Sequence, residues 1–189
     1  FVPIRSAGSG RAITETSAKV QVAPDDEELS REERLRRLES QVLACTRCDL
    51  HLGRTTGVPG MGVLDPEVMV IGEGPGGEED RQGIPFVGAA GRYLDKWLAA
   101  IEVYRDKNAY IANIVKCRPP NNRDPKPEEA ATCIPYLQKQ IEIVRPKSIL
   151  TVGRVAFRYL TGESEGIGRV HGRVYDYRGI PLMPTYHPS

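Results

Sequence analysis

The chain has 189 residues, a hydrophobic share of 40% and a formal net charge of +1 at pH 7. This length suits one domain with a buried core, and the near-neutral charge excludes binding to nucleic acid by overall charge alone, so any such binding must come from local patches. No apolar window reaches the roughly 18 residues of a membrane span, and the first residues show no signal-peptide core. We therefore expect an intracellular protein in a reducing compartment.

The first 29 residues mix glycine, serine and proline with an acidic run at 25–28 and show no apolar period, which predicts a flexible tail at 1–29. Ser30 followed by Glu33 is a capping-box pattern, and apolar residues recur at helical spacing from Leu35 to Leu43. We expect a helix there that leads into the first cysteine pair, and one domain from residue 30 to residue 189.

Strands and helices alternate along the rest of the chain. We expect strands at 68–71, 109–115, 148–152 and near Leu182, with helices at about 89–101, at 127–144 and just before Leu160. Residues 169–178 alternate in a way that predicts an added hairpin or edge pair. The pattern predicts an α/β fold, a three-layer αβα sandwich around a central, mostly parallel four-stranded sheet. Ligands bind such sheets at the carboxyl ends of the strands, here the loops after Ile71, Ile111 and Leu182.

The four cysteines form one C-x2-C pair and two remote single residues, Cys45, Cys48, Cys117 and Cys133. Two disulfides are not expected in a reducing compartment, so the pattern favours metal ligation. Zinc ribbons usually pair a C-x2-C with a second such pair or with histidines, whereas 4Fe–4S clusters accept single cysteines from remote loops. An iron–sulfur cluster is therefore favoured, with zinc as the alternative.

A glycine-rich stretch follows the first strand, Gly72–Gly77, and an aromatic residue, Phe86, lies a few residues beyond it. Glycines let backbone amides approach a ligand closely. The stretch lacks the lysine of a P-loop and the glycine spacing of a dinucleotide fingerprint, so neither of these sites is predicted. A long surface turn is the alternative, but an aromatic residue in such a loop favours a flat ligand that stacks on it.

Polar residues follow two other strands. Asn113 offers a donor and an acceptor that complement a base edge, although a strand-end cap is the alternative. His187 lies past the last strand on the same rim, where it could donate to a developing anion, although a surface histidine is the alternative. Basic residues near Cys117 suit phosphate or are simply solvated: Lys116, Arg118, Arg123 and Lys126.

Four motifs in one order, together with the spacing of the cysteines, resemble a known family. The motifs are G-E-G-P-G-x-E-E-D, P-F-V-G-A-A-G, N-I-V-K-C-R-P-P-x-N-R and H-P-S. From about Leu43 to Ser189 the chain is similar to the family-four, iron–sulfur uracil-DNA glycosylases. The resemblance implies a glycosylase fold, hydrolysis of the N-glycosidic bond of flipped-out uracil in DNA, and a structural 4Fe–4S cluster on the four cysteines.

The resemblance also implies roles for single residues. Phe86 would stack on the flipped base, Asn113 would read the uracil edge, and His187 would donate to O2 of the departing uracil anion. Glu73 is the candidate for orienting water or stabilising the sugar cation, and Glu79 is a second catalytic candidate. The other candidates for substrate contact are Gly72, Gly74, Pro75, Gly76 and Asn122.

The chain departs from related enzymes at several positions. Family-one enzymes carry an Asp that positions water where this chain has Gly74, and a Tyr that excludes thymine where it has Gly76, so Glu79 is our candidate for rejecting the C5 methyl group. Some relatives capture uracil-DNA covalently through a histidine, and residues 118–126 contain none, which argues against this chemistry. The family continues past Ser189 with a loop that wedges into the minor groove, so we expect weaker activity on duplex DNA.

Two other functions are alternatives. A non-catalytic or weakly catalytic module would bind uracil-DNA without cleaving it, whereas an iron–sulfur redox or scaffold protein would leave the glycine-rich stretch, Phe86 and His187 without a role. The expected partner is uracil-containing DNA, single- or double-stranded, with no membrane. We expect a monomer located in the cytoplasm with activity at the nucleoid.

Overall fold

The structure is a computed structural model that describes residues 28–189. The tail predicted at 1–29 therefore lies outside the described residues except for its last two positions. Beyond it, helix α1 (Arg31–Leu43) begins at the predicted capping box, in which Ser30 Oγ accepts from the Glu33 amide at 3.2 Å and Glu33 Oε2 accepts from the Ser30 amide at 2.9 Å. The prediction for this helix is confirmed.

A mixed sheet forms the middle layer, with the strand order β1-β3-β2-β4-β6-β5. Its four central strands are all parallel: β2 (Val68–Gly72), β3 (Ala109–Asn113), β4 (Ile149–Val152) and β6 (Ile180–Thr185). They confirm the predicted parallel core. Two short antiparallel strands, β1 (Met61–Gly62) and β5 (Tyr175–Tyr177), extend this core to six strands, so the predicted count of four is too low. Of the hairpin or edge pair predicted at 169–178, only β5 is a strand, and it pairs with β6 at the edge of the sheet.

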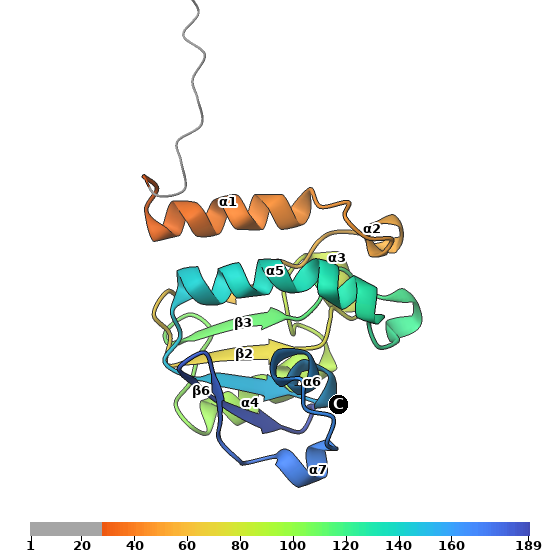
Figure 1. The fold of residues 1–189 in the computed structure, drawn as a ribbon. Coiled ribbons are helices and arrows are strands. Elements are labelled where there is room, and N and C mark those ends of the chain that lie inside the picture. The colour runs from red at the N-terminus through yellow and green to blue at the C-terminus, as the bar shows by residue number, and fades with distance from the viewer. Residues whose placement is uncertain (1–27) are drawn as a thin grey trace, which may run out of the picture.

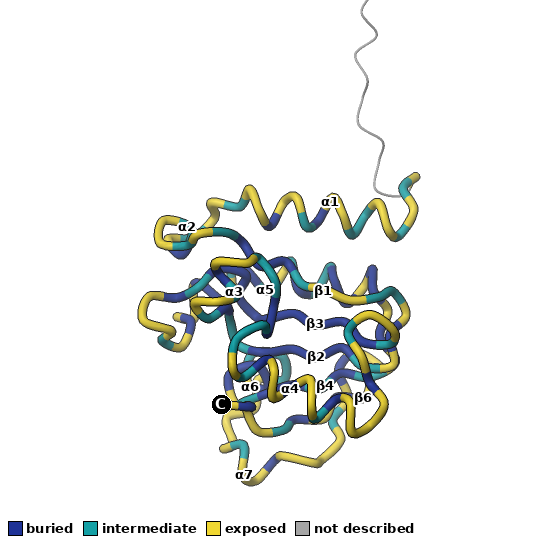
Figure 2. The backbone as a smooth tube through the Cα atoms, turned by 180° about the vertical axis from the view of Figure 1, so that it is seen from behind, coloured by how far each residue is buried: buried dark blue, intermediate teal, exposed yellow. Residues whose placement is uncertain are grey.

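Helices cover both faces of the sheet (Figures 1 and 2). Met69 and Ile71 of β2 point to the face under α5 (Pro127–Val144) and α6 (Arg154–Thr161), and Val70 points to the face under α4 (Ala89–Ala99). Helix α1 packs along the outer side of α5. The three-layer arrangement follows from the alternation of apolar side chains along each strand.

Two short helices, α2 (Leu50–Gly53) and α3 (Gly77–Gln82), and the 3-10 helix η1 (Pro120–Asn122) lie where no regular structure was predicted. A third short helix, α7 (Ile167–Val170), overlaps the start of the edge pair predicted at 169–178. Helix α3 begins at the last glycine of the glycine-rich stretch, and its first turn carries three acidic residues, which interact favourably with the positive end of the helix dipole. Among residues 28–189, no helix combines the length and the hydropathy that crossing a membrane requires.

Candidate active site

A cavity of about 520 Å³ opens at the carboxyl ends of the parallel strands. The loop after β2, the end of β3, the turn between β4 and α6, and the segment after β6 all contribute to its wall. It brings together nine of the ten predicted catalytic and substrate-contact residues: Glu73, Gly74, Pro75, Gly76, Glu79, Phe86, Asn113, Asn122 and His187. The tenth, Gly72, ends β2 directly beneath two of them.

Asn113 is the last residue of β3 and is almost completely buried, with 1% of its surface exposed. Its side-chain oxygen has no hydrogen-bond partner within the described part of the chain. A buried acceptor that stays unpaired costs about 1–3 kcal/mol, and this one belongs to a residue that lines the cavity. The backbone is held from below, because Lys116 Nζ donates to the Asn113 carbonyl at 2.8 Å.

Gly72 leaves the space that the Asn113 and Phe86 side chains occupy. A Cβ atom at this position would lie 2.4 Å from Cζ of Phe86 and 2.6 Å from Oδ1 of Asn113. Any larger residue would therefore push apart the aromatic ring and the amide. The glycine brings a flat apolar surface and a hydrogen-bonding edge to the same point of the cavity.

His187 completes this group from the other side, with its ring centroid 6.1 Å from that of Phe86 and its Nδ1 2.8 Å from Ser189 Oγ. The residue is exposed, but the protein around the ring displaces enough water to lower the pKa of His187 below its usual value. The imidazole is therefore neutral at pH 7. When the Ser189 hydroxyl donates to Nδ1, Nε2 carries the proton and can donate it in a hydrogen bond.

Glu73 lies in the loop after β2, and its carboxylate makes no hydrogen bond to residues 28–189. Burial raises the pKa of Glu73, repulsion from Asp124 raises it further, and Arg154 lowers it in part. Arg154 and Asp124 form an ion pair of 2.9 Å that also lines the cavity. The Glu73 carboxylate is thus a negative group without a hydrogen-bond partner among the described residues, close to the Arg154–Asp124 ion pair.

Glu79 is arranged differently from Glu73. Its two carboxylate oxygens accept hydrogen bonds from three backbone amides, those of Gly76 at 3.1 Å, Val87 at 2.9 Å and Gly88 at 2.8 Å. A carboxylate with both oxygens engaged in this way is suited to holding a loop. These contacts favour a positioning role for Glu79 over proton transfer or direct contact with a substrate.

The predicted basic patch is only partly present. Lys116 has 1% of its surface exposed, and its Nζ donates to Gln140 Oε1 at 2.6 Å as well as to the Asn113 carbonyl, so its assignment to a phosphate-facing patch is wrong. Burial lowers the pKa of Lys116 to about 8. Arg118 donates to Asn122 Oδ1 at 2.8 Å, and Arg123 pairs with Glu129, so two of the arginines shape the loop.

Cys45 and Cys48 lie in the segment between α1 and α2, Cys117 lies in the loop after β3 and Cys133 lies on helix α5, and all four thiols are free. Arg54 Nη1 donates to Cys117 Sγ at 2.9 Å, and the Lys116 amide donates to Cys133 Sγ at 3.2 Å. Burial raises the pKa of Cys133 to about 11, and repulsion from Cys117 and Cys48 adds to this effect. The thiols therefore lie near enough to affect one another's ionisation.

No group of three or more metal-binding side chains within the described range is gathered tightly enough for a single metal ion. The donor set itself is nevertheless of one chemical kind, four thiols that become soft thiolate ligands, with N–H groups directed at two of the sulfur atoms. Thiolates supported by such hydrogen bonds are the ligands of iron–sulfur clusters. The residues present fit that group.

Comparison with known proteins places this chain in a family. Residues 59–189 match the family model described as "Uracil DNA glycosylase superfamily". The Type-4 uracil-DNA glycosylase of Thermotoga maritima is 45% identical over 162 residues, which cover 85% of this chain and 84% of that protein. This chain belongs to the type-4 branch of the uracil DNA glycosylase superfamily. The corresponding protein of Sulfurisphaera tokodaii is 42% identical over 163 residues, 82% of this chain and 74% of that protein.

A more distant relative, the Type-5 uracil-DNA glycosylase of Pyrobaculum aerophilum, is 34% identical over 149 residues, 70% of this chain and 65% of that protein. The uracil-DNA glycosylase fold predicted from the sequence motifs is thereby confirmed. The cavity lies within the residues that the superfamily model matches.

Three polar residues of this cavity were not given a role from the sequence: Asp124, Arg154 and Ser189. Arg154 opens α6 directly after β4, at a carboxyl strand end like the others. The rule that ligands bind at carboxyl strand ends applies to this loop as well, but the prediction covered only three of the four strand ends. Ser189 belongs to the H-P-S motif, but its contact with His187 depends on the turn between them, which the motif alone does not predict.

Proposed function

We propose that this protein is a DNA-repair hydrolase that cleaves the N-glycosidic bond of flipped-out uracil in DNA and leaves free uracil and an abasic site. One observation carries the proposal: the buried Asn113 amide keeps an unpaired oxygen beside the Phe86 ring, at the bottom of the cavity. An acceptor of this kind next to a flat apolar surface suits the edge and the face of a pyrimidine.

Base recognition follows from the donor and acceptor pattern of the Asn113 amide. Its oxygen accepts from N3–H of uracil and its NH2 group donates to O4. Cytosine presents an acceptor at N3 and a donor at N4, so both groups of the amide would stay unpaired in the buried site. Each unpaired group costs about 1–3 kcal/mol, which disfavours cytosine.

Access to the cavity requires the nucleotide to leave the DNA stack, at a cost of a few kcal/mol. Stacking of the base on Phe86 returns about 1–3 kcal/mol, and the cavity of about 520 Å³ lies within the size range of small-molecule sites. We propose single- and double-stranded uracil-DNA as substrates, with Asn122 and the amides of residues 72–77 in contact with the nucleotide.

Bond cleavage transfers the bonding electron pair to N1 of uracil, which leaves as an anion, while water adds its oxygen to C1′ of the sugar. Neutral His187 donates a hydrogen bond to O2 as the negative charge develops, an interaction worth about 1.5–3 kcal/mol with a charged partner. Glu73, whose carboxylate is unpaired, orients the water or stabilises the positive charge on the sugar. The proton of the water finally neutralises the released uracil.

We further propose that the four cysteines hold a 4Fe–4S cluster with a structural role. When bound, the cluster supplies a cross-link and takes no part in the reaction on uracil. Cys45 and Cys48 would join the segment between α1 and α2 to the loop that carries Cys117 and to helix α5 through Cys133. We also propose residues 30–189 as the catalytic domain, acting as a monomer in the cytoplasm on DNA of the nucleoid.

The test uses the iron-loaded full chain and a labelled single-stranded oligonucleotide that contains one uracil, followed by alkali, which cleaves abasic sites. Strand scission at the uracil, and none on a matched oligonucleotide with cytosine, is the expected result. Retention of the labelled oligonucleotide without scission would favour a binding module. The absence of both retention and scission would contradict the proposal and would favour a redox or scaffold protein.

A matched pair of variants checks the leaving-group assignment. His187→Ala is expected to slow scission strongly while preserving binding of the oligonucleotide, because the hydrogen bond to the anion is gained only as the bond breaks. His171→Ala changes the other histidine of the last third of the chain, which lies outside the cavity lining, and is expected to leave the rate unchanged. Equal rates for His187→Ala and wild type would contradict the assignment.

A further inference from the structure

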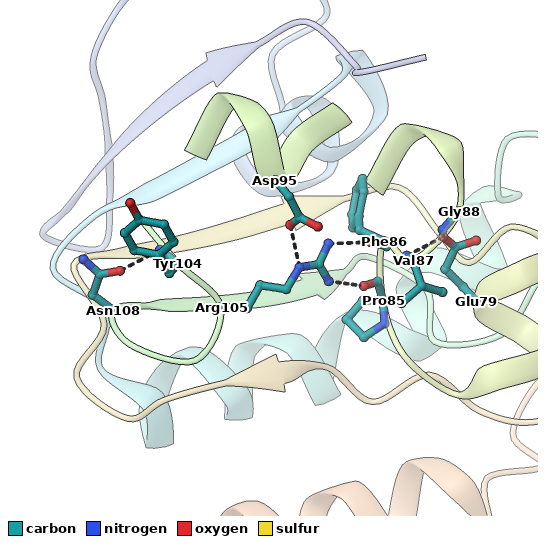
Figure 3. A network of polar contacts seen from close by, with 9 residues as sticks. All are labelled: Glu79, Pro85, Phe86, Val87, Gly88, Asp95, Tyr104, Arg105 and Asn108. Carbon is teal, nitrogen blue, oxygen red and sulfur yellow. Dashed lines mark hydrogen bonds and ion pairs between the residues drawn. The ribbon is translucent and has the colours of Figure 1, made fainter. Parts of the chain in front are cut away.

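The loop that carries Phe86 is held by a charged side chain that does not itself line the cavity (Figure 3). Arg105 lies in the connection between α4 and β3, and it donates from Nη1 to the Pro85 carbonyl at 2.6 Å and from Nη2 to the Phe86 carbonyl. Its Nε donates to Asp95 Oδ1 on α4 at 2.6 Å. All three nitrogen atoms of the guanidinium thus donate to partners within the protein.

The opposite side of the same loop is held by Glu79, which accepts from the amides of Val87 and Gly88. Two successive carbonyls therefore bind one cation, and the two following amides bind one anion. Charge-assisted hydrogen bonds of this kind are stronger than neutral ones. All four residues of the Pro85–Gly88 segment are fixed through their backbone, which leaves the Phe86 ring free to face the cavity.

The backbone at Phe86 needs such support. Its φ angle of 53° lies in the left-handed region, which is unfavourable for a residue with a Cβ atom. On the far side of the same peptide, a Cβ atom at Gly91 would lie 1.8 Å from the Phe86 carbonyl oxygen, so only glycine lets α4 approach this closely. The peptide is thus enclosed between the first turn of α4 and the Arg105 guanidinium.

We propose that Arg105 is a positioning residue for base stacking: it fixes the Pro85 and Phe86 carbonyls and thereby the plane of the Phe86 ring, while Asp95 orients its guanidinium. The planar fork of arginine serves two carbonyls at once, which the single ammonium of lysine does not. The side chain of Arg105 is only 17% exposed, so water competes little for these contacts. The inference rests on the proposed function, because it assigns Phe86 to the base.

The test is a double-mutant cycle with Arg105→Lys and Phe86→Leu, measured as kcat/KM for excision of uracil from single-stranded DNA and as inhibition by free uracil. Arg105→Lys is expected to lower kcat/KM about tenfold and to weaken inhibition by uracil in parallel. In the Phe86→Leu background the same change is expected to have almost no further effect, because the ring that it positions is absent.

The matched control is Arg34→Lys, since Arg34 also bridges to a carboxylate on another element, Glu142 at 3.1 Å, but lies on α1 away from the cavity. It is expected to leave kcat/KM and inhibition by uracil unchanged. Should Arg105→Lys fail to fold, Asp95→Asn takes its place in the cycle, with a smaller loss in the same direction that again depends on Phe86.

Two results would overturn the inference: an unchanged kcat/KM in Arg105→Lys, or an equal loss in both backgrounds, which would mean that Arg105 acts independently of Phe86. Both differ from failure of the proposed function. If the proposed function itself failed, the wild-type protein would release no uracil, and neither would any variant at position 105.

Discussion

We expect the unpaired side-chain oxygen of Asn113 to lower the stability of the free protein. Its buried oxygen has no hydrogen-bond partner among residues 28–189, and such a group typically costs about 1–3 kcal/mol. Functional sites commonly keep groups of this kind, because a group arranged for a ligand stays unsatisfied without it. We therefore interpret the unpaired oxygen of Asn113 as a group that lowers stability in the free protein and binds the base in the complex.

Asn113→Leu is therefore expected to raise the free energy of unfolding by about 1 kcal/mol, because an apolar group of similar size replaces an unpaired polar one. The same change is expected to slow uracil excision about 100-fold or more, since both hydrogen bonds to the base are lost. Denaturant unfolding and the rate of strand scission measure the two effects.

Thr151→Val is the matched control. Thr151 on β4 is the other described residue with a buried, unpaired side-chain oxygen, and it lies outside the cavity lining. Its replacement should stabilise the protein to a similar extent and leave excision unchanged. A loss of stability in Asn113→Leu, or equal losses of activity in both variants, would contradict the interpretation of Asn113.

Glu73 is expected to set the acid limb of the pH–rate profile. The reaction needs the Glu73 carboxylate, and burial together with Asp124 raises the pKa of Glu73. As the pH is lowered, the rate should therefore begin to fall at a pH above the usual pKa range of a glutamate. Glu73→Gln should remove this limb. Arg154→Gln should move the limb to higher pH, because the cation of Arg154 lowers the pKa. An acid limb that persists unchanged in Glu73→Gln would rule out this assignment.

Glu73 should also affect the stability of the protein, and this effect should depend on pH in the opposite direction to its effect on the rate. A carboxyl group whose pKa is raised in the folded state binds its proton more tightly there, so its contribution to stability is present at low pH and is lost as pH rises through the raised pKa. Glu73→Gln should therefore be more stable than wild type at neutral pH. The difference should vanish below the ordinary pKa of 4.5, as thermal unfolding at several pH values would show.

At the scale of elements, the sequence predicts best where local signals agree. Helix α5 was predicted at the bounds that the structure shows, since Pro127 opens it and apolar residues keep a helical period to Val144. Strand β1 has only two residues and no period to detect. Helix α3 was missed because its glycines suggested a loop, and its start depends on the Glu79 carboxylate, which caps Gly76.

The proposed cluster would join elements that are far apart in sequence, namely the segment between α1 and α2, the loop after β3 and helix α5. Removal of the iron is therefore expected to increase amide hydrogen exchange in residues 44–54 and 114–123, while the core strands β2 and β4 stay protected. Replacement of Cys133 by Ala should reproduce this pattern and lower the iron content. Unchanged exchange in these segments after complete loss of iron would contradict a structural role.

At the scale of the whole molecule, the parallel sheet explains why the site's location was predictable and its support was not. Parallel strands bring their carboxyl ends to one edge, so residues from three separate motifs were expected together, and they are. Arg105 was not predictable, because its partners are backbone carbonyls 19 and 20 residues away. The assignment of Lys116 was wrong because burial of a lysine depends on tertiary packing, here with Gln140.

The central claim is that Asn113 selects uracil for release from DNA. The most direct measurement is the time course of free uracil released from single-stranded DNA with one uracil, by wild type and by Asn113→Leu at equal iron content. We expect one uracil for each abasic site formed by wild type, and a rate lower by about 100-fold or more for the variant. No free uracil from the iron-loaded wild-type protein, or equal rates for the two proteins, would contradict the account.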